Sequence, residues 1–413
     1  MFSINSRTLT PALRLRTPVR CASTHASKGP LAGVTVVSLE QAIAAPFCTR
    51  QLADLGARVI KIERPGVGDF ARNYDNRVNG FASHFVWANR SKESLALDLK
   101  KPRDHAILMR LLGKADVLVQ NLAPGASARL GLSHDDLKAK HPSLIVCNIS
   151  GYGPDGPYRD KKAYDLLIQS EAGMLSVTGT GKEPAKVGIS IADISAGCYA
   201  YSNILAALLQ RGNDPERRGV NLDISMLESM AEWMSFPMYY TYQNAPGPTP
   251  AGASHAAIYP YGPFETGDGK SVMLGIQNER EWVNFCDKVL GLPDLATDGR
   301  FVNNSLRTKN RDALKAKIHE AFADKTSQQV IALLDQAAIA NANVNDMQGV
   351  WEHPQLKARG RWTEVATPAG PIPALLPPGL TQGGNLPARL DAVPDVGEHN
   401  ASILAELGID DSE

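Results

Sequence analysis

The sequence predicts an α/β protein with a mostly parallel sheet, joined to a smaller α+β unit. Apolar runs typical of buried strands alternate with helical patterns between residues 33 and 150. A segment rich in Pro, Gly, Ala and Ser, a linker or a functional loop, interrupts this pattern at 243–268. The chain has 413 residues, 43% hydrophobic and 21% charged, and can therefore bury a sizeable core.

The opening strand–helix–strand unit sets the fold class. GVTVVSLE at 33–40 predicts a buried strand, AAPFCTRQLADLG at 44–56 a helix, and ARVIKIER at 57–64 the next strand. Pro46 suits the first turn of that helix and Gly56 its carboxyl end. This spacing implies a right-handed crossover between two parallel strands.

The alternation continues along the chain. We expect further strands at 94–100, 116–123 and 144–150, a helix at 103–115, a long apolar helix at 194–211, and a strand and helix within 219–236. Together these units predict a large Rossmann-like domain with helices on both faces of the sheet. The smaller unit is predicted from 270–277, 279–291 and two helical stretches around 308–338, and a strand-like piece follows at 362–368.

Composition argues against several classes of protein. Lys+Arg and Asp+Glu both number 43, whereas nucleic-acid binders usually show a basic excess. The sequence contains no stretch of about 18 uninterrupted apolar residues, so a membrane-spanning helix is not expected. The five cysteines have no paired spacing, so neither a metal site nor a disulfide framework is expected. GxSxG, HExxH and P-loop motifs are absent from the sequence.

The first 30 residues are basic and contain no Asp or Glu. Ser and Thr are frequent there, which is the composition of an organelle transit peptide. We therefore predict a transit peptide over 1–28 and a mitochondrial matrix enzyme; a merely disordered tail is the alternative. The cations are Arg7, Arg14, Arg16, Arg20 and Lys28.

A GxGxxG pattern follows the strand predicted at 144–150. It consists of Gly151, Gly153 and Gly156. A dinucleotide site would need a helix to begin at once, but Pro154 and Pro157 make that start doubtful. The segment is interpreted as a turn.

Cations lie near the expected carboxyl ends of the strands. These are Arg64, Arg90, Lys92 and Arg129, with Asn121 closing another strand. Such ends gather at one edge of a parallel sheet, so these side chains could converge on an anionic ligand. The alternative is that each is a solvated surface cation.

Asp193 stands in VGISIADISAGCYA, at the start of the long apolar helix. Composition alone favours a helix N-cap, for which Asp is a preferred residue. The position also suits a nucleophile, because a helix N-terminus keeps a carboxylate ionised and oriented. A partly desolvated carboxylate there can attack a carbonyl and form a covalent acyl intermediate.

Seven segments together resemble the family III CoA-transferases. They occur in the family's order and run from about residue 30 to 410, so their combination is far more specific than any one of them. With this resemblance the nucleophile role of Asp193 is favoured over the N-cap. The segments are 46–69, 89–100, 121–132, 150–165, 187–197, 252–264 and 393–408.

The resemblance implies a reaction that exchanges coenzyme A between carboxylates. Asp193 would attack the donor thioester, and the resulting anhydride would pass to an aspartyl-CoA thioester and then to the acceptor acid. A coenzyme A thioester is then a substrate, and no prosthetic group or metal is expected. The reaction needs a positioned carboxylate, exclusion of water from the anhydride, and donors for the developing oxyanions.

The resemblance also assigns binding residues. Tyr164 would face the acyl group, and Gly252 would belong to a flap that shields it. One departure is Leu122-Ala123, where many relatives have an aromatic residue and Arg; a cation is lost there, so we expect the phosphate contacts of this region to differ. The coenzyme A contacts would be Ile43, Ala44, Arg64, Asn89, Arg90, Lys92, Asn121, Arg129 and Lys162.

The family fold implies an interlocked-ring homodimer. Each protomer would have a large domain built from residues 30–215, a linker and small domain over 216–335, and a return segment over 336–413 that completes the large domain. The implied partners are an acyl-CoA, a free carboxylic acid and a second copy of the chain, with no nucleic acid or membrane.

The sequence does not decide among several possible substrates. The wording of the segments is most like succinyl-CoA enzymes whose acceptors are glutarate, hydroxymethylglutarate, itaconate or citramalate. Formyl-CoA/oxalate-type or carnitine-type transfer is the alternative, and a non-catalytic coenzyme A-binding protein is a further one. A 2-methylacyl-CoA racemase would place His where Tyr164 stands, and an unperturbed tyrosine is a poor base near neutral pH.

Overall fold

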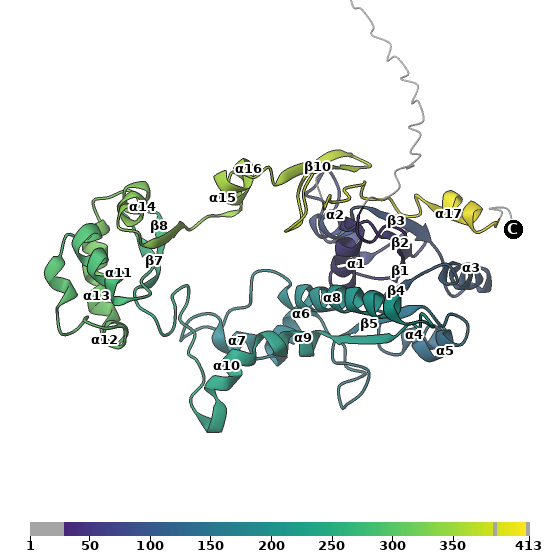
Figure 1. The fold of residues 1–413 in the computed structure, drawn as a ribbon, viewed down its shortest axis with the longest axis horizontal. Helices are drawn as coiled ribbons and strands as arrows, with labels where there is room; N and C mark the ends of the chain where they lie inside the picture. Colours follow the sequence, from purple (N-terminus) through teal and green to yellow (C-terminus); the bar gives the residue numbers. More distant parts are fainter. Residues whose placement is uncertain (1–28, 383–385, 410–413) are drawn as a thin grey trace, which may run out of the picture.

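The computed structural model describes residues 29–382 and 386–409, so the predicted transit peptide lies outside the described residues. Its larger unit contains a six-stranded parallel sheet in the order β3-β2-β1-β4-β5-β6 (Figure 1). This doubly wound order confirms the predicted fold class. The strands are β1 (Thr35–Leu39), β2 (Arg58–Glu63), β3 (Lys92–Ala96), β4 (Val117–Gln120), β5 (Ile145–Ser150) and β6 (Asn221–Ser225).

Alternate residues of each strand point to opposite faces, and both faces are covered by helices. One face, with Val36 and Val117, packs against α1 (Ala44–Asp54) and α8 (Ile191–Asn213). The other face, with Val37 and Leu118, packs against α3 (Pro102–Leu112) and α17 (Asn400–Glu406). The central strands β1, β4 and β5 are therefore mostly apolar, as the sequence pattern predicted.

The remaining helices of this unit are short and lie mostly after the strand ends. Helix α9 follows residue 215, where the N-terminal part of the large domain was expected to end. Its Met226 and Met230 nevertheless belong to the same core as α1 and α8. These helices are η1 (Phe70–Asn73), α2 (Ser83–Asn89), α4 (Ala126–Arg129), α5 (His134–Lys138), α6 (Asp165–Glu171), α7 (Met174–Val177), α9 (Met226–Trp233), α10 (Ser235–Tyr240) and η2 (Tyr242–Asn244).

A smaller α+β unit with its own core follows, as predicted. Its antiparallel sheet has the order β7-β8-β9, formed by Tyr261–Glu265, Ser271–Gly275 and Ala340–Asn343. Strand β7 lies inside the segment interpreted as a linker or loop. The proline content of the segment had favoured a loop. Pro263 is compatible with β7 because this strand lies at the edge of the sheet, where proline is tolerated. The helices are α11 (Glu279–Asn284), η3 (Phe285–Val289), η4 (Pro293–Ala296), α12 (Asn304–Lys309), α13 (Arg311–Phe322) and α14 (Ser327–Gln336).

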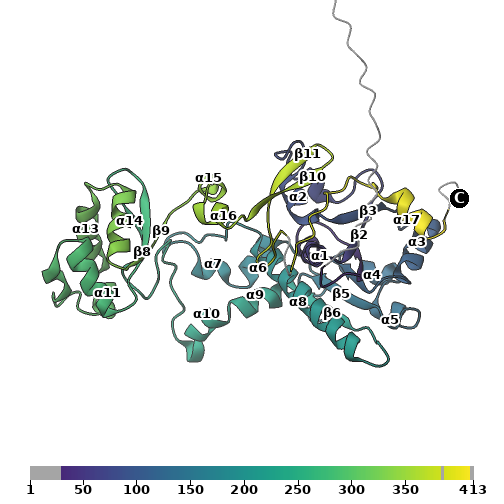
Figure 2. The ribbon, with the colours of Figure 1, turned by 45° about the horizontal axis from the view of Figure 1, so that its top comes forward.

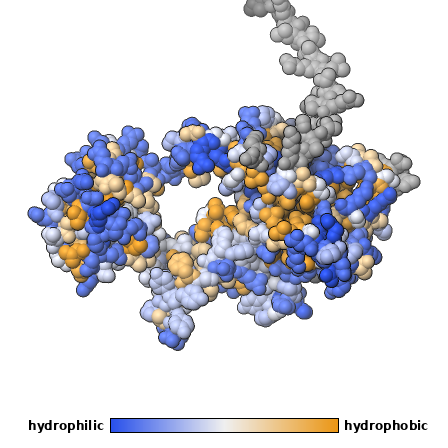
Figure 3. Space-filling view, viewed as in Figure 1, coloured by the Kyte–Doolittle hydropathy of each residue, from blue (hydrophilic) through white to orange (hydrophobic). Residues whose placement is uncertain are grey.

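The chain then returns to the larger unit. Val365 and Ile372, from the antiparallel hairpin of β10 (Trp362–Thr367) and β11 (Gly370–Leu375), pack against Phe85 of α2. The connection carries α15 (Met347–Trp351) and α16 (Pro354–Ala358). Figures 1 and 2 show two separate connections between the units, and Figure 3 shows an opening through the molecule between them.

The strand predicted at 94–100 is shifted. Strand β3 begins at Lys92 and ends at Ala96. The N–H of Lys101 donates to the carbonyl of Asp98, forming a turn before Pro102 begins α3. The alternation of apolar and polar residues that predicted the strand therefore continues beyond Ala96 into that turn.

A buried ion-pair cluster fixes α1 to the chain before β3. The guanidinium of Arg90 donates two hydrogen bonds of 2.8 Å to Asp54, and Arg50 donates a third of 3.0 Å. All three side chains are buried. Removing the shared carboxylate would leave two guanidinium groups without a partner.

We therefore predict that Asp54→Ala lowers the free energy of unfolding by about 3–5 kcal/mol. The matched control is Asp135→Ala, which removes an exposed carboxylate paired with Lys138 and should leave the unfolding midpoint almost unchanged. Urea unfolding followed by circular dichroism measures both. Equal shifts of the two unfolding midpoints would contradict a structural role for the buried cluster.

Candidate active site

A cleft of about 2030 Å³ lies at the carboxyl edge of the parallel sheet, around the point where the strand order reverses between β1 and β4. Ligands of open α/β sheets bind at such a reversal. Its walls come from the segments after β1, β4 and β5, from η1 and α2, and from the first turn of α8. The lining residues used below are Ala42, Ile43, Ala44, Phe70, Tyr74, His84, Trp87, Asn121, Lys162, Tyr164, Asp165 and Asp193.

Asn121 joins the two loops at this reversal. Its side-chain oxygen accepts a 2.8 Å hydrogen bond from the N–H of Gln41, and its side-chain nitrogen donates to the Gln41 carbonyl at 2.9 Å. The pair ties the segment after β1 to the end of β4. Asn121 therefore shapes the cleft as well as lining it.

Asp193 lies in the first turn of α8 but does not cap it. Ser190 occupies the cap position without a side-chain capping bond. Asp165 supplies the acceptor instead, because its Oδ1 receives the N–H of Ala192 at 2.8 Å and that of Asp193 at 3.4 Å. The N-cap interpretation of Asp193 is therefore wrong, and its carboxylate is left for another task.

Two effects raise the pKa of Asp193 to about 7. Burial is the larger, and the neighbouring Asp165 carboxylate adds repulsion. A hydrogen bond from the backbone of Ala44, at the N-terminus of α1, acts in the opposite direction. A carboxylate poised near neutral pH in a cleft marks a candidate functional group.

Gly197 allows α1 and α8 to approach closely enough for this contact. A Cβ atom at Gly197 would lie 2.7 Å from the carbonyl oxygen of Ala44 and 3.0 Å from the Phe47 ring. Small residues on α8, including Ala196 and Ala200, extend the same tight packing. The glycine thus sets the position of the Ala44 backbone relative to Asp193.

Buried charges support the loop that carries Ala44. Ala42 has a φ of 62°, which is unusual for a residue other than glycine. Its N–H donates to Asp69 Oδ1 at 3.1 Å, and Asp69 Oδ2 accepts from Lys61 at 2.8 Å. Asp69 and Lys61 are fully buried, so the loop rests on an internal ion pair.

Glu40 and Lys92 extend this support. The ammonium of Lys92 donates to Glu40 Oε1 at 2.6 Å, to the carbonyl of Pro46 at 3.0 Å and to Asn89 Oδ1 at 3.0 Å. Burial alone would raise the pKa of Glu40, but Lys92 and Lys61 hold it down at about 2. Glu40 is therefore ionised beneath the loop.

The structure brings together only part of the predicted site. Ile43, Ala44, Asn121, Lys162, Tyr164 and Asp193 line the cleft. Asn89, Arg90 and Lys92 are buried in the contacts above, while Arg64 and Arg129 are exposed outside the lining. Gly252 also lies outside it, with its N–H donating to the Gly179 carbonyl at 2.6 Å.

The GxGxxG segment forms a turn, as interpreted. Gly153 and Gly156 have φ values of 98° and 76°, and the next helix begins only at Asp165. The segment supplies the cleft wall that contains Lys162 and Tyr164.

Sequence reasoning missed the wall formed by η1 and α2, with Phe70, Tyr74, His84 and Trp87. Burial, followed by the charges of Asp69 and Asp193, raises the pKa of Tyr74 to about 12, so its hydroxyl stays protonated. No motif marks these residues; the available signal was their place in the segment after β2, whose carboxyl end lies at the same sheet edge.

Two further findings concern residues 29–382 and 386–409. No cluster of three or more His, Cys, Asp or Glu side chains there is arranged to hold a metal ion. Within the same ranges, no helix combines the length and the apolar character that crossing a membrane would require.

Comparison with known proteins defines the class. The model of CoA-transferase family III matches residues 31–400. An acyl-CoA transferase of Fusarium pseudograminearum is 34% identical over 94% of this chain and 87% of its own. The human succinyl-CoA:glutarate CoA-transferase is 30% identical over 92% and 86%. A CaiB/BaiF family crystal structure from Brucella suis, 32% identical, superposes with a TM-score of 0.82 over 92% and 99%.

The chain therefore belongs to CoA-transferase family III, which confirms the resemblance. It is an acyl-CoA:carboxylate CoA-transferase. Other relatives have names that specify oxalate, mesaconate or D-citramalate as the acid.

The raised pKa of Asp193 has a consequence for stability. The folded protein holds this proton more tightly than the unfolded chain, whose ordinary pKa is 3.8. The contribution of this group to stability is therefore present below about pH 4 and is lost as pH rises towards 7. We predict that Asp193→Asn stabilises the fold by about 1–3 kcal/mol at pH 8 and by little at pH 4.

Urea unfolding at both pH values measures this difference. Asp268 is the control of opposite sign, because hydrogen bonds from Thr266 and Ser327 lower the pKa of its carboxyl. Asp268→Asn should therefore lose its largest increment of stability at the higher pH. An Asp193→Asn increment that is the same at pH 4 and pH 8 would contradict the raised pKa.

Proposed function

We propose that this enzyme transfers coenzyme A from succinyl-CoA to a short dicarboxylic acid, with Asp193 as the covalent nucleophile. The observation that supports it best is the half-desolvated Asp193 carboxylate in a cleft of about 2030 Å³, beside the N-terminus of α1. The acceptor class is that of glutarate, hydroxymethylglutarate, itaconate or citramalate. The human relative named for succinyl-CoA and glutarate supports this choice.

The first half-reaction begins with ionised Asp193. One carboxylate oxygen attacks the thioester carbonyl, the C–S bond breaks, and the products are a mixed anhydride and the coenzyme A thiolate. The thiolate then attacks the aspartyl carbonyl of the anhydride and releases succinate. The result is an aspartyl-CoA thioester on Asp193.

The second half-reaction reverses these steps with the acceptor. Its carboxylate attacks the aspartyl thioester and forms a new anhydride with release of thiolate. The thiolate then attacks the acceptor's acyl carbon, which yields the new thioester and regenerates the Asp193 carboxylate. Each step exchanges one carboxylate for another on the same sulfur, so the reaction is near thermoneutral and needs no ATP.

The surroundings of Asp193 suit these steps. The Ala44 backbone donates a hydrogen bond to Asp193, and the protonated Tyr74 hydroxyl, whose pKa the Asp193 charge helps to raise, is proposed as a second donor for developing charge. Lys162 and Asn121, from the segments after β5 and β4, are proposed to contact coenzyme A. Gly252 is proposed to belong to a shielding flap, with Tyr164 at the acyl group.

We also propose an interlocked-ring homodimer. Figure 3 shows an opening between the two units, through which the partner chain is proposed to pass, and orange, apolar surface borders it below. Phe236, Tyr239 and Tyr242 are 69%, 76% and 68% exposed on α10 and η2. Exposed aromatic side chains of this kind are typical of a surface that a partner covers.

A mitochondrial matrix location is proposed from composition alone. Residues 1–28 are basic and lack acidic side chains, which fits a transit peptide.

A donor–acceptor matrix tests the function. Purified protein would receive succinyl-CoA with each of glutarate, hydroxymethylglutarate, itaconate, citramalate and oxalate, and the thioesters would be identified by mass. We expect new thioesters of the longer dicarboxylates, and at least a 10³-fold lower rate for Asp193→Asn, because an amide is not a comparable nucleophile. Formation of oxalyl-CoA alone, or full activity of the variant, would contradict the proposal.

A further inference from the structure

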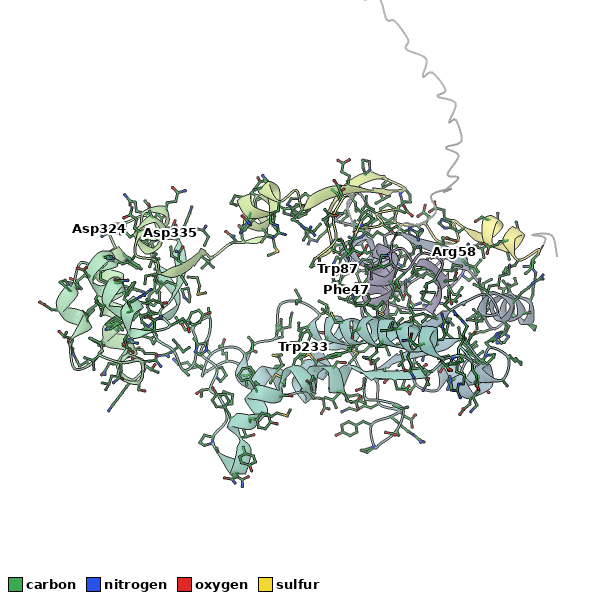
Figure 4. All side chains as sticks on the ribbon, in the orientation of Figure 1. Phe47, Arg58, Trp87, Trp233, Asp324 and Asp335 are labelled. Carbon is green, nitrogen blue, oxygen red and sulfur yellow. The ribbon has the colours of Figure 1, made fainter. Side chains whose placement is uncertain are left out.

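The wall of the cleft formed by η1 and α2 is aromatic but contains one imidazole. Phe70, Tyr74 and Trp87 are 43%, 47% and 37% exposed, and Trp87 packs on Phe47 with ring centroids 5.1 Å apart. Figure 4 shows Phe47 and Trp87 at the edge of the larger unit that faces the opening. His84 lines the cleft on the same wall. The aromatic side chains around it would suit an apolar acyl chain, so a polar imidazole on this wall calls for an explanation.

The orientation of His84 is fixed by two neighbours. Its ring meets that of Tyr74 edge to face, with centroids 5.5 Å apart at 85°. Its Nδ1 lies 3.9 Å from Asp75 Oδ2. Nδ1 is buried, whereas 43% of the side chain is exposed. The exposed edge of the ring is therefore the one that carries Nε2.

Asp75 is held in place as an anion. Its oxygens accept hydrogen bonds from the Ser83 N–H at 3.0 Å, the Ser83 hydroxyl at 2.6 Å and the Arg77 N–H at 3.0 Å. These hydrogen bonds hold the Asp75 carboxylate beside the buried Nδ1 edge of the ring, 3.9 Å away. The opposite edge of the ring, with Nε2, is therefore the one that can contact a ligand in the cleft.

Tyr74 connects His84 to the nucleophile. Its ring contacts His84, and Asp193 is near enough that its charge helps to raise the pKa of Tyr74. All three side chains line the same cleft. An acyl group attached to Asp193 and directed along this wall would therefore extend past Tyr74 towards His84.

Other cations that line the cleft come from the segments after β5 and before α8, and several have partners. Lys161 is paired with Glu171, and Arg159 with Asp160. Lys186 donates to the carbonyl of Val187. Among the described lining residues, His84 is the basic group on the η1–α2 wall.

We propose that His84 binds the second carboxylate of the dicarboxylic substrate and thereby selects dicarboxylic over monocarboxylic acids. This inference rests on the proposed function and specifies its substrate class. A carboxylate placed against an aromatic wall loses hydration and needs a hydrogen-bond partner to compensate. A monocarboxylic acid of the same length would leave the prepared imidazole unpaired, and such sites discriminate strongly.

The test compares glutarate with pentanoate, which has the same carbon chain but one carboxylate. In a ping-pong reaction the kcat/KM of the acceptor does not depend on the donor, so succinyl-CoA serves throughout. His84→Phe keeps a ring against Tyr74 and removes the nitrogen atoms. We expect the ratio of the two kcat/KM values, glutarate over pentanoate, to fall about 10- to 100-fold.

Two variants separate binding from folding. His84→Lys supplies a hydrogen-bond donor at the same position and should keep most of the ratio, which would not be expected if the histidine were merely structural. His353→Phe, outside the cleft lining, should leave the ratio unchanged. Failure of the unmodified enzyme to form glutaryl-CoA would defeat the proposed function itself. An unchanged ratio in an active His84→Phe enzyme would overturn only the role of His84.

Discussion

The close packing of α1 on α8 is the constraint on which the site depends. Because Gly197 has no side chain, the Ala44 backbone can lie against the first turn of α8. That approach places a backbone hydrogen bond at Asp193 while the surrounding chain removes water from it. The result is a carboxylate that is neither fully ionised by a strong partner nor fully neutralised by burial. A larger residue at 197 would separate the helices and release both effects together.

The charges beneath the cleft explain how this geometry is maintained. Ala42 holds a left-handed conformation at a cost, and the Asp69 carboxylate that accepts its N–H is fixed by Lys61. Lys92 links Glu40 to the first turn of α1 through the Pro46 carbonyl. Buried ion pairs contribute little net stability compared with apolar packing, but breaking one is costly. In this molecule they hold one loop in one conformation.

The sequence predicted the fold well because its signal is local. Strand–helix alternation determines a parallel sheet, and all six strands of the larger unit lie within or beside predicted runs. The functional site was harder to predict from the sequence. Arg90 and Lys92 were expected near an anion, yet their partners Asp54 and Glu40 lie 36 and 52 residues away in the chain. Which cations face a cleft and which pair internally depends on tertiary contacts that spacing does not reveal.

Asp193 itself illustrates the same limit. Its identity as a candidate came from the resemblance of seven segments, whereas composition favoured a helix cap. The structure shows that Asp165, from a different helix, accepts the first-turn N–H groups of α8. No pattern within residues 187–197 indicates that Asp165, rather than Asp193, accepts these hydrogen bonds. The wall with Tyr74 and His84 was also invisible, because aromatic residues after a strand are ordinarily part of a core.

The central claim is that Asp193 bonds covalently to the transferred groups. The most direct measurement is to quench the enzyme with acid during turnover with succinyl-CoA, treat it with hydroxylamine or borohydride, and locate the modified peptide by mass spectrometry. The account predicts a modification confined to Asp193 and absent from Asp193→Asn. An unmodified Asp193 in samples that are forming product would contradict it.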